Sequence, residues 1–371
     1  MRIGIDCRLW NETGVGRYTR NLVGELDKID NHNQYVLFVL SRDAENLKSQ
    51  ISNLKNGKWK LVVADIRWHS VTEQLEFPGV LEKENLDLVH FPYFSVPIFY
   101  NRPFVVTIHD LILHDFPTGQ ASTMPYPFYW LKHFGYKAVI SSAAKRAFEV
   151  IAVSEATKKD IVDHLHVQES KVAVTYEGVD AGIVGKNKNN HSLVKSDYFL
   201  FVGNAYPHKN LDRLFSAFRQ IRVKNPAISL VLVGREDYFY RRLRKQPRDG
   251  VLFLTASSDK ELQNLYRNAK ALIMPSLMEG FGLPPLEAMS NDCVVLASDI
   301  PSFREICNNA AIYFDPYDSN SIASVMQSVL ASKNKKQLDE LKEIGKKHAS
   351  TFSWEKMAKE TLAVYESCLS V

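Results

Sequence analysis

The segment of the sequence that decides the fold is MPSLMEGFGLPPLEAM, residues 274–289. It begins at the end of a short apolar run, 271–274, that predicts a buried strand. Two glycines then mark a loop, and Pro284 and Pro285 fit the first turn of a helix beginning at Leu283, because that turn does not need its N–H groups. A strand, a glycine loop and a helix N-terminus in this order present backbone N–H groups and a helix dipole to an anion. The segment therefore predicts an anion-binding loop.

Two glutamates bracket this loop. Glu279 precedes the glycines, and Glu287 lies on the first turn and a half of the helix. A carboxylate accepts two hydrogen bonds side by side, so either one could hold a vicinal diol of a ribose or a hexose. A site with phosphate between two diols would be a nucleotide-sugar site. On spacing alone, two glutamates eight residues apart and a Gly-x-Gly loop are equally typical of an ordinary structural turn.

The composition is that of an ordinary globular protein of about two domains, with 371 residues, 45% of them hydrophobic and 24% charged. The net charge of +4 is too small to indicate nucleic-acid binding, although it suits contact with phosphates or lipid headgroups. The four cysteines are scattered, which favours a reducing compartment over a disulfide or zinc framework. The sequence has no signal-peptide pattern, and no apolar run approaches the roughly 20 residues of a membrane-spanning helix. A cytoplasmic protein is therefore expected.

The first half of the sequence alternates apolar runs with helical stretches. Strands are predicted at 2–5, 35–40, 60–63, 86–90, 104–108, 150–153 and 171–176. After the first strand, Gly14 and Gly16 predict a second glycine loop ahead of a helix over Tyr18–Leu26, although a plain tight turn would use the same residues. His109 follows the strand 104–108, at the end where open parallel sheets place their ligands. It could equally bond the next turn.

The second half repeats the alternation, with strands predicted at 198–202, 229–233, 251–254, 271–274 and 294–298. Lys209 lies just before an amphipathic helix, where the dipole disfavours a positive charge, so a phosphate-binding role is favoured over a structural one. Arg235 and Thr255 each follow a strand of this half. A polar stretch from Gly185 to Ser196 predicts a linker between the halves.

The string Glu279-Gly-Phe-Gly-Leu-Pro-Pro-Leu-Glu287 closely resembles the Glu-x7-Glu signature of retaining glycosyltransferases of family 4. The run TGVGRY, residues 13–18, is similar to a loop near the start of these enzymes, and the alternation covers most of the chain. The resemblance implies an α/β protein of the GT-B fold, with two Rossmann-like, doubly wound parallel-sheet domains facing across a cleft. It implies an acceptor domain over 1–180, a linker over 181–196 and a nucleotide-sugar domain over 197–353. The C-terminal helix, 354–371, would pack back on the first domain.

The resemblance also assigns roles to residues. Glu287 would hold the ribose hydroxyls, and Lys209 the diphosphate together with the backbone of Gly280–Leu283. Glu279, Phe281 and Gly282 would hold the transferred sugar, and His109 would face it across the cleft. The remaining residues expected to bind the nucleotide sugar are Gly14, Gly16, Asn204, Arg235, Gly280, Leu283 and Thr255. Asn204 replaces the arginine usual in the family, and Arg235 is a candidate substitute.

The reaction implied is transfer of an α-linked sugar with retention of configuration. No Asp-x-Asp metal motif is present, so no metal and no other cofactor are expected. The loops around Gly16 and Lys209 look most like the mannosyltransferase branch of polysaccharide and O-antigen assembly, which favours GDP-mannose as donor and a glycan or lipid-linked glycan as acceptor. UDP-glucose, UDP-N-acetylhexosamine and dTDP-rhamnose remain open. A sugar-nucleotide epimerase, a non-catalytic partner of another transferase and a periplasmic sugar-binding protein are the other functions to separate.

The segment 125–148 is rich in aromatic and basic residues, a composition typical of helices that lie on a membrane surface. This predicts peripheral attachment to the cytoplasmic leaflet. A helix packed on the sheet with a solvated basic face explains the same residues.

Overall fold

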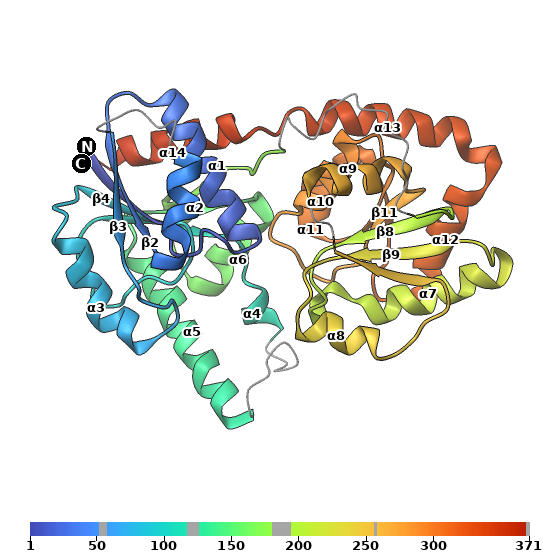
Figure 1. Cartoon of the computed structure of the whole chain (residues 1–371), viewed down its shortest axis with the longest axis horizontal. Coiled ribbons are helices and arrows are strands. Elements are labelled where there is room, and N and C mark those ends of the chain that lie inside the picture. The colour runs from blue at the N-terminus through green and yellow to red at the C-terminus, as the bar shows by residue number, and fades with distance from the viewer. Residues whose placement is uncertain (52–57, 117–125, 180–193, 256–257, 369–371) are drawn as a thin grey trace. The chain divides into compact units, whose positions relative to one another are not determined.

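The computed structural model describes residues 1–51, 58–116, 126–179, 194–255 and 258–368. The chain forms two compact units, which divide at Gly178 and again between Ser353 and Trp354. Each unit is built on a parallel sheet with helices on both faces (Figure 1). The predicted α/β class with two Rossmann-like domains is therefore confirmed. Most of the predicted linker lies outside the described residues.

Over the described residues, the first unit contains a seven-stranded sheet in the order β3-β2-β1-β4-β5-β6-β7, and all neighbouring strands pair in parallel. Its strands are β1 (Arg2–Asp6), β2 (Gln34–Val39), β3 (Trp59–Val63), β4 (Leu88–Phe91), β5 (Phe104–Ile108), β6 (Glu149–Ala152) and β7 (Val172–Val174). Its helices are α1 (Gly14–Ile29), α2 (Ser41–Ile51), α3 (Val71–Glu82), α4 (Ile112–Asp115), α5 (Tyr126–Arg146), α6 (Glu155–Leu165) and α14 (Trp354–Ser367).

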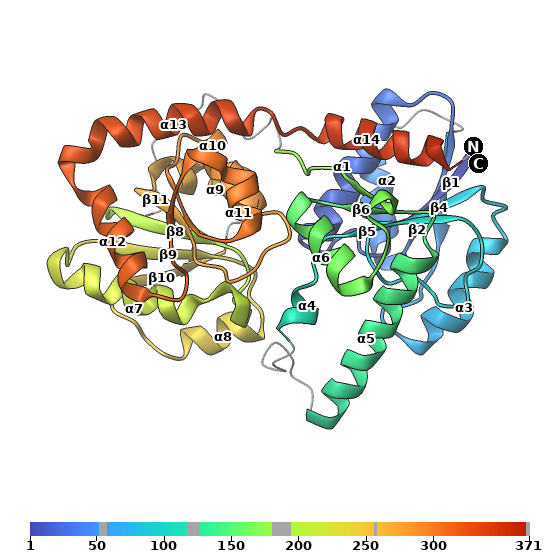
Figure 2. The same ribbon diagram turned by 180° about the vertical axis from the view of Figure 1, so that it is seen from behind.

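The last helix, α14, completes this first unit by packing along α1, as both ribbon views show (Figures 1 and 2). A buried hydrogen bond of 2.6 Å joins Tyr365 of α14 to Nδ1 of His90 on β4, and Thr107 of β5 lies 2.8 Å from Nε2. Burial, with a smaller effect from His109, lowers the pKa of His90 to about 3. The helix that ends the chain is thus bonded to a neutral histidine in the core of its first sheet.

Over the described residues, the second unit contains a six-stranded parallel sheet in the order β10-β9-β8-β11-β12-β13. Its strands are β8 (Tyr198–Val202), β9 (Ser229–Val233), β10 (Val251–Leu254), β11 (Ala271–Met274), β12 (Val295–Ser298) and β13 (Ala311–Phe314). Its helices are α7 (Leu211–Lys224), α8 (Tyr238–Arg244), α9 (Asp259–Asn268), α10 (Leu283–Ser290), α11 (Pro301–Cys307), α12 (Ser319–Leu330) and α13 (Lys335–Ala349). Alternate residues of its strands, such as Phe199 and Phe201, pack with α7 and α12 in one buried cluster.

The prediction of a glycine loop before α1 is wrong, because the helix begins at Gly14 and both glycines lie in its first turn. A Cβ on Gly16 would lie only 2.5 Å from the Trp10 carbonyl oxygen, so this glycine allows the first turn to pack on the preceding backbone. Around Gly14 nothing lies within 4 Å of such a Cβ. A close approach is thus found at Gly16, to the protein's own backbone.

In the described part of the chain, no helix is both long and apolar enough to cross a bilayer. The four cysteines are free thiols. Among the residues that the structure describes, no group of three or more His, Cys, Asp or Glu side chains is arranged to hold a metal ion.

Candidate nucleotide-sugar site

The second sheet brings two loops together where its strand order reverses, between β8 and β11, which is where open parallel sheets bind ligands. The loop after β8 contains Lys209, and the loop after β11 contains Glu279. Leu277 N–H donates to the His208 carbonyl at 2.8 Å. The Asn210 side-chain amide donates to the Pro275 carbonyl at 2.9 Å. The two loops therefore form one bonded assembly.

Lys209 and Glu279 form a salt bridge inside this assembly. The Lys209 ammonium donates to Glu279 Oε1 at 2.5 Å, and the Ser276 hydroxyl donates to the same oxygen at 2.6 Å. Both charged side chains are only 11% exposed. Burial raises the pKa of Glu279, but Lys209 and His208 outweigh it and hold this pKa below its ordinary value. Within the described part of the chain, no hydrogen bond engages the other carboxylate oxygen, Oε2.

A short backbone turn aims Lys209 at Glu279. Pro207–Lys209 form a 3-10 turn that ends at Asn210, whose φ of +59° is a left-handed value that asparagine tolerates better than most residues. The Asn210 amide also donates to the Pro316 carbonyl at 2.7 Å, which fixes the turn from the other side. The neighbouring His208 is 8% exposed, and burial together with Lys209 lowers its pKa to about 4. It is therefore neutral at neutral pH.

Helix α10 begins beside this pair, and no side chain among the described residues makes a capping hydrogen bond at its N-terminus. Its N-cap is Gly282, at a φ of +109°, and a Cβ there would lie 2.8 Å from the Phe303 ring, so only glycine fits without strain. Pro284 and Pro285 occupy the first turn, as predicted. The Phe281 ring packs edge-on against Phe352, and the residue as a whole is 4% exposed.

Glu287 lies on α10 and is 2% exposed. The Tyr266 hydroxyl, from α9, donates to its Oε2 at 2.7 Å. The side chains of Ser290 and Asn291 donate to its backbone carbonyl at 2.8 and 2.9 Å. The Tyr266 hydrogen bond thus orients the carboxylate before any ligand arrives.

Three further predicted residues lie at the same edge of the second sheet. Asn204 follows β8, Arg235 follows β9 and Thr255 follows β10. Asn204 is half-buried, and its side-chain oxygen accepts a hydrogen bond of 3.3 Å from Tyr206 N–H. Arg235 and Thr255 are exposed. Their shared edge follows from parallel pairing, because all carboxyl ends of parallel strands lie on one side.

His109 lies in the first unit, at the carboxyl end of β5. Its Nε2–H donates to the Pro92 carbonyl at 3.0 Å, and Nδ1 lies 3.1 Å from Glu177 Oε1. Both ring nitrogens therefore face acceptors, so the contact with Glu177 needs a proton on Nδ1 or on the carboxylate. The ring of Tyr18, the last residue of the TGVGRY run, packs edge-on at 5.0 Å from the His109 ring.

Sequence reasoning missed the partners of these residues. Glu177, Ser276 and Tyr266 each contact a predicted site residue directly, and Asn210 fixes the turn that contains Lys209. An asparagine directly after Lys209 and before a helix was a usable signal for a left-handed turn. Glu177 and Tyr266 carry no local signal, because their contacts join residues 68 and 21 positions apart.

Comparison with known proteins places these observations in a family. The family described as Glycosyltransferase Family 4 matches residues 13–182, and that described as Glycosyl transferases group 1 matches residues 185–348. The O-antigen chain mannosyltransferase RfbU of Salmonella typhimurium is 30% identical over 267 residues, covering 71% of this chain and 70% of RfbU. The O-antigen chain mannosyltransferase B of Escherichia coli is 26% identical over 297 residues, covering 75% of this chain and 74% of that protein.

Two solved structures share the fold over nearly all of both chains. Sucrose-phosphate synthase from Thermosynechococcus elongatus has a TM-score of 0.79 at 18% identity, covering 100% of this chain and 99% of that one. WaaG, a glycosyltransferase involved in lipopolysaccharide biosynthesis, has a TM-score of 0.71 at 13% identity, covering 98% and 99%. With both family descriptions matched and a relative at 30% identity, the chain belongs to the glycosyltransferases with the GT-B fold.

Proposed function

We propose that this glycosyltransferase moves mannose from GDP-mannose, with retention of anomeric configuration, to a glycan or lipid-linked glycan acceptor in cell-surface polysaccharide synthesis. The observation that carries the proposal is the Lys209–Glu279 pair beside the uncapped N-terminus of α10. The names of two relatives, both O-antigen chain mannosyltransferases, support the choice of sugar and pathway. HepE of Anabaena, which shares the fold with a TM-score of 0.74, was solved with UDP-glucose and supports a nucleotide sugar as donor.

Lys209 is suited to stabilising a diphosphate leaving group. An ammonium has three N–H donors, and among the described residues Glu279 takes the one hydrogen bond found for it. The other donors can turn to the phosphate oxygens, where the dipole of α10 adds to the attraction. Charge that develops on the diphosphate as the glycosidic bond breaks would thus meet groups already in place.

Glu279 and Glu287 then divide the donor between them. Glu279 Oε2 would accept a hydroxyl of the transferred sugar, while Oε1 stays bonded to Lys209 and Ser276. Glu287 would hold the ribose hydroxyls from its fixed position beside Tyr266. In this arrangement the groups that act on the diphosphate are an ammonium and backbone dipoles, so the proposed reaction needs no divalent metal. Full activity in the presence of EDTA supports this, and a loss that magnesium or manganese restores contradicts it.

The experiment that tests the donor is a thermal-shift screen against GDP, UDP and dTDP, followed by a transfer assay. A ligand that binds only the native state at a hundredfold excess over Kd adds about 2.7 kcal/mol to its stability. GDP is expected to give the largest shift, and a larger shift with UDP or dTDP would replace mannose by another sugar. Transfer to an acceptor, with an α-linked product by NMR, is expected. An epimerised sugar without transfer would identify the epimerase alternative.

The two glutamates separate binding from turnover. Glu287→Gln is expected to weaken GDP binding by about 1.5–3 kcal/mol, the range for hydrogen bonds to a charged group. Glu279→Gln should bind GDP nearly as well as wild type and turn over more slowly, because the sugar is the only part of the donor that Glu279 is proposed to contact, and the charge of the sugar changes in the transition state. The opposite pattern would reverse the two roles.

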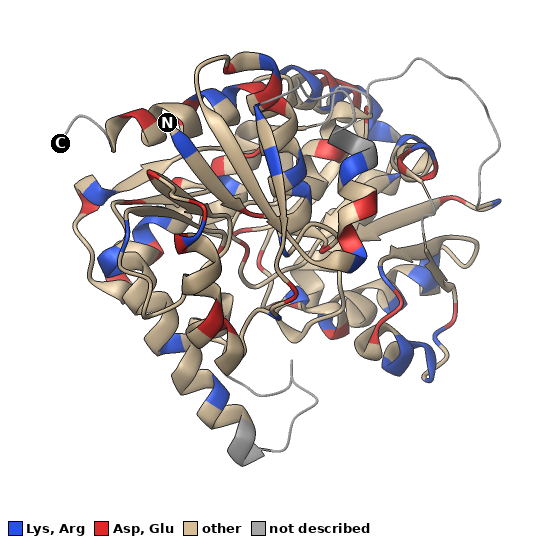
Figure 3. Cartoon of the chain, turned by 60° about the vertical axis from the view of Figure 1, so that its left-hand side comes forward, with Lys and Arg blue, Asp and Glu red and all other residues tan. Residues whose placement is uncertain are grey.

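Peripheral membrane attachment fits the same function, because a lipid-linked acceptor lies at the cytoplasmic face of a membrane. Helix α5 exposes 72% of Leu131 and 66% of Phe134, and Lys132 beside them is also exposed. Lysine and arginine recur along this helix (Figure 3). His133 and Ile140 are buried, so the helix also packs on its unit, and the exposed strip is the part available to lipid.

A further inference from the structure

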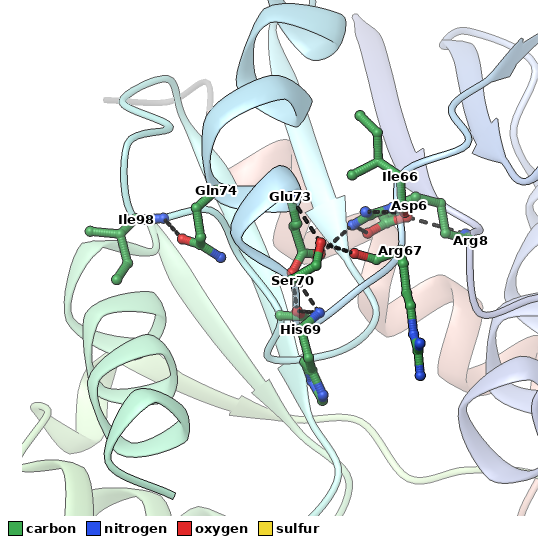
Figure 4. Close-up of polar contacts among 10 residues, drawn as sticks. Asp6, Arg8, Ile66, Arg67, His69, Ser70, Glu73, Gln74 and Ile98 are labelled. Atoms are coloured by element: carbon green, nitrogen blue, oxygen red, sulfur yellow. Dashed lines mark hydrogen bonds and ion pairs between the residues drawn. The ribbon is translucent and has the colours of Figure 1, made fainter. Parts of the chain in front are cut away.

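A buried guanidinium ties together the loops at the carboxyl edge of the first sheet (Figure 4). Arg8 is 1% exposed and donates to both carboxylate oxygens of Asp6, at 2.8 and 2.7 Å. It also donates to the Ile66 carbonyl at 3.0 Å and to Glu73 Oε1 at 2.7 Å. Its planar group lies 3.7 Å from the centre of the Phe77 ring. Arg8 therefore joins the end of β1 to the loop after β3 and to α3.

Glu73 extends this network to the next loop. It is fully buried, and its Oε2 accepts hydrogen bonds from His69 N–H at 2.8 Å and from the Ser95 hydroxyl at 2.7 Å. Ser70 caps α3 by accepting from Glu73 N–H, and its own hydroxyl donates to the Arg67 carbonyl at 2.6 Å. The segment 66–70 is thus bonded at four of its five residues, Ile66, Arg67, His69 and Ser70.

Burying ionised groups is expensive, and a buried ion pair is therefore weak grounds for expecting extra stability. What the network does supply is a fixed backbone for the segment 66–70. Figure 4 shows the Arg67 side chain extending away from the network, while its carbonyl faces Ser70. The fixed loop therefore presents the side chain of Arg67 outward, beside Trp68.

A hollow of about 550 Å³ opens on this outward side. It lies at the carboxyl ends of β1, β2 and β3, which are adjacent in the sheet. The side chains that line it include Glu12, Ser41, Arg42, Asp65, Arg67 and Trp68. All of these residues belong to the first unit, so the hollow is complete within it.

The lining of the hollow matches the chemistry of a neutral sugar. Two arginines and two carboxylates balance in charge, and guanidinium and carboxylate groups each bond two neighbouring hydroxyls at once. Trp68 is half-buried and gives an indole surface on which the apolar face of a pyranose can pack. Asp65 is held by Ser41 N–H at 2.7 Å, and the Arg42 guanidinium lies 5.9 Å from the Trp68 ring centre. A phosphate would find no net positive charge here.

We propose that this hollow is a subsite for a neutral hexose unit of the acceptor glycan, with Arg67 and Trp68 as its main contacts. The proposal rests on the proposed function only in taking the bound sugar to be part of the acceptor. In this proposal, the Arg8 network fixes the backbone of the segment 66–70 and so holds Arg67 and Trp68 in place.

Binding of the sugar is tested without turnover. Methyl α-D-mannopyranoside and mannobiose are titrated up to about 100 mM, far above a millimolar Kd, with saturation-transfer NMR as the readout. Wild type is expected to bind at least one probe, and Trp68→Ala and Arg67→Ala to lose about tenfold in affinity, with partial recovery in Trp68→Phe. Arg102→Ala, an exposed arginine just before β5 and so at the opposite edge of the sheet, is the matched control and should bind as wild type.

Kinetics separate this proposal from the proposed function. If mannosyl transfer is observed, Trp68→Ala and Arg67→Ala should raise the acceptor KM about tenfold while the donor KM and the GDP thermal shift stay unchanged. If no transfer is observed with any donor, the proposed function fails and the binding titration alone decides the subsite. Equal sugar binding by wild type and Trp68→Ala, no sugar binding by wild type, or binding of inorganic pyrophosphate in place of sugar would each overturn the proposal.

Discussion

Among the described residues, each of the two sheets has a buried cation at its carboxyl edge, Arg8 in the first unit and Lys209 in the second, and the two cations are bonded differently. Arg8 of the first unit is 1% exposed and donates hydrogen bonds to Asp6, Glu73 and the Ile66 carbonyl. Lys209 of the second unit is 11% exposed, and Glu279 takes the one hydrogen bond found for its ammonium in the described part of the chain. The guanidinium is nearly saturated by protein, whereas the ammonium has donors left over. A saturated buried cation supports its neighbours, and an unsaturated one is available to a ligand.

The pKa shifts of the charged groups in the two pairs also differ. Burial by itself would lower the pKa of Arg8, but Asp6 and Glu73 hold this pKa above its ordinary value. Burial raises the pKa of Glu73, and Arg8 offsets that rise only in part. For Glu279 the balance goes the other way, since Lys209 holds its pKa below the ordinary value despite burial. The carboxylate at the candidate site is thus kept ionised more firmly than the one in the supporting network.

The largest expected effect is on the stability of the first unit. Arg8→Met removes the partner of Asp6 and Glu73, and breaking a buried pair on one side is expected to cost about 3–5 kcal/mol. Urea unfolding, with hydrogen exchange to follow each unit, measures it. Arg2→Ala is the control, because Arg2 pairs with Glu84 at 31% exposure and such a pair contributes about 0–1 kcal/mol. A loss below that of the control would mean that Arg8 is not a support.

Next in size is the effect of Lys209 on turnover. Lys209→Met is expected to lower kcat by about 10²- to 10³-fold, the range seen when one preorganised electrostatic group is removed. The second unit should remain folded by circular dichroism and hydrogen exchange. Lys270→Met, which breaks an exposed pair with Asp197, is the control and should leave kcat unchanged. If both lysine variants were equally active, an unsaturated cation would not mark the site.

A smaller effect is expected from His208, the neighbour of Lys209. Its pKa is lowered to about 4, so the folded protein favours the neutral ring, and the stability this contributes is complete above the unfolded pKa of about 6.5. It is lost as pH falls from about 6.5 to 4, by about 3 kcal/mol, from 1.36 kcal/mol for each pKa unit. Unfolding free energies at pH 7.5 and pH 4.5 measure it. His208→Asn should flatten this dependence relative to wild type, whereas His32→Asn, at an exposed histidine, should not.

The smallest expected effect is on binding to lipid vesicles, which we expect for the surface of the first unit and not for that of the second. If the first unit handles a lipid-linked acceptor, its α5 should bind anionic vesicles weakly, at about 1 kcal/mol for each basic residue near the surface. Flotation at low salt should recover wild type with anionic but not neutral vesicles, and Phe134→Ser should float less. Val223→Ser, at an exposed valine of α7 in the second unit, should float as wild type. Equal, negligible recovery with both vesicle types would leave α5 as a packing helix alone.

Most of the fold could be predicted from the sequence, because the patterns that indicate its strands and helices are local. The apolar runs 104–108, 198–202, 229–233 and 251–254 coincide with observed strands. The prolines after Gly282 mark the start of α10. What could not be predicted are contacts set by the order of strands in the sheet. Arg8 meets Glu73 across 65 positions and His109 meets Glu177 across 68, and neither pair has a spacing that a local pattern could reveal.

Gly14 and Gly16 show the opposite failure, in which a local signal was present and ambiguous. Glycines between a strand and a helix are typical of a loop, but here they begin α1, and Gly16 leaves room for the Trp10 carbonyl. The neighbouring group that makes a glycine necessary, here a backbone carbonyl, is set by the folded structure. The same holds for Gly282, whose missing Cβ makes room for the Phe303 ring.

Because α14 packs on the first unit, it determines which of the two units can be completed first during synthesis. The first sheet is complete in sequence at Gly178, yet Tyr365, which bonds His90 in its core, is made 187 residues after it. At roughly 5–20 residues per second, that interval lasts on the order of ten to forty seconds, during which the first unit lacks one wall and the whole second unit emerges. The second unit, which needs nothing downstream of Ser353 for its own contacts, can finish first. Residues 1–353, held on the ribosome by an added C-terminal linker that clears the exit tunnel, should accordingly resist protease in the second unit and remain cleavable in the first.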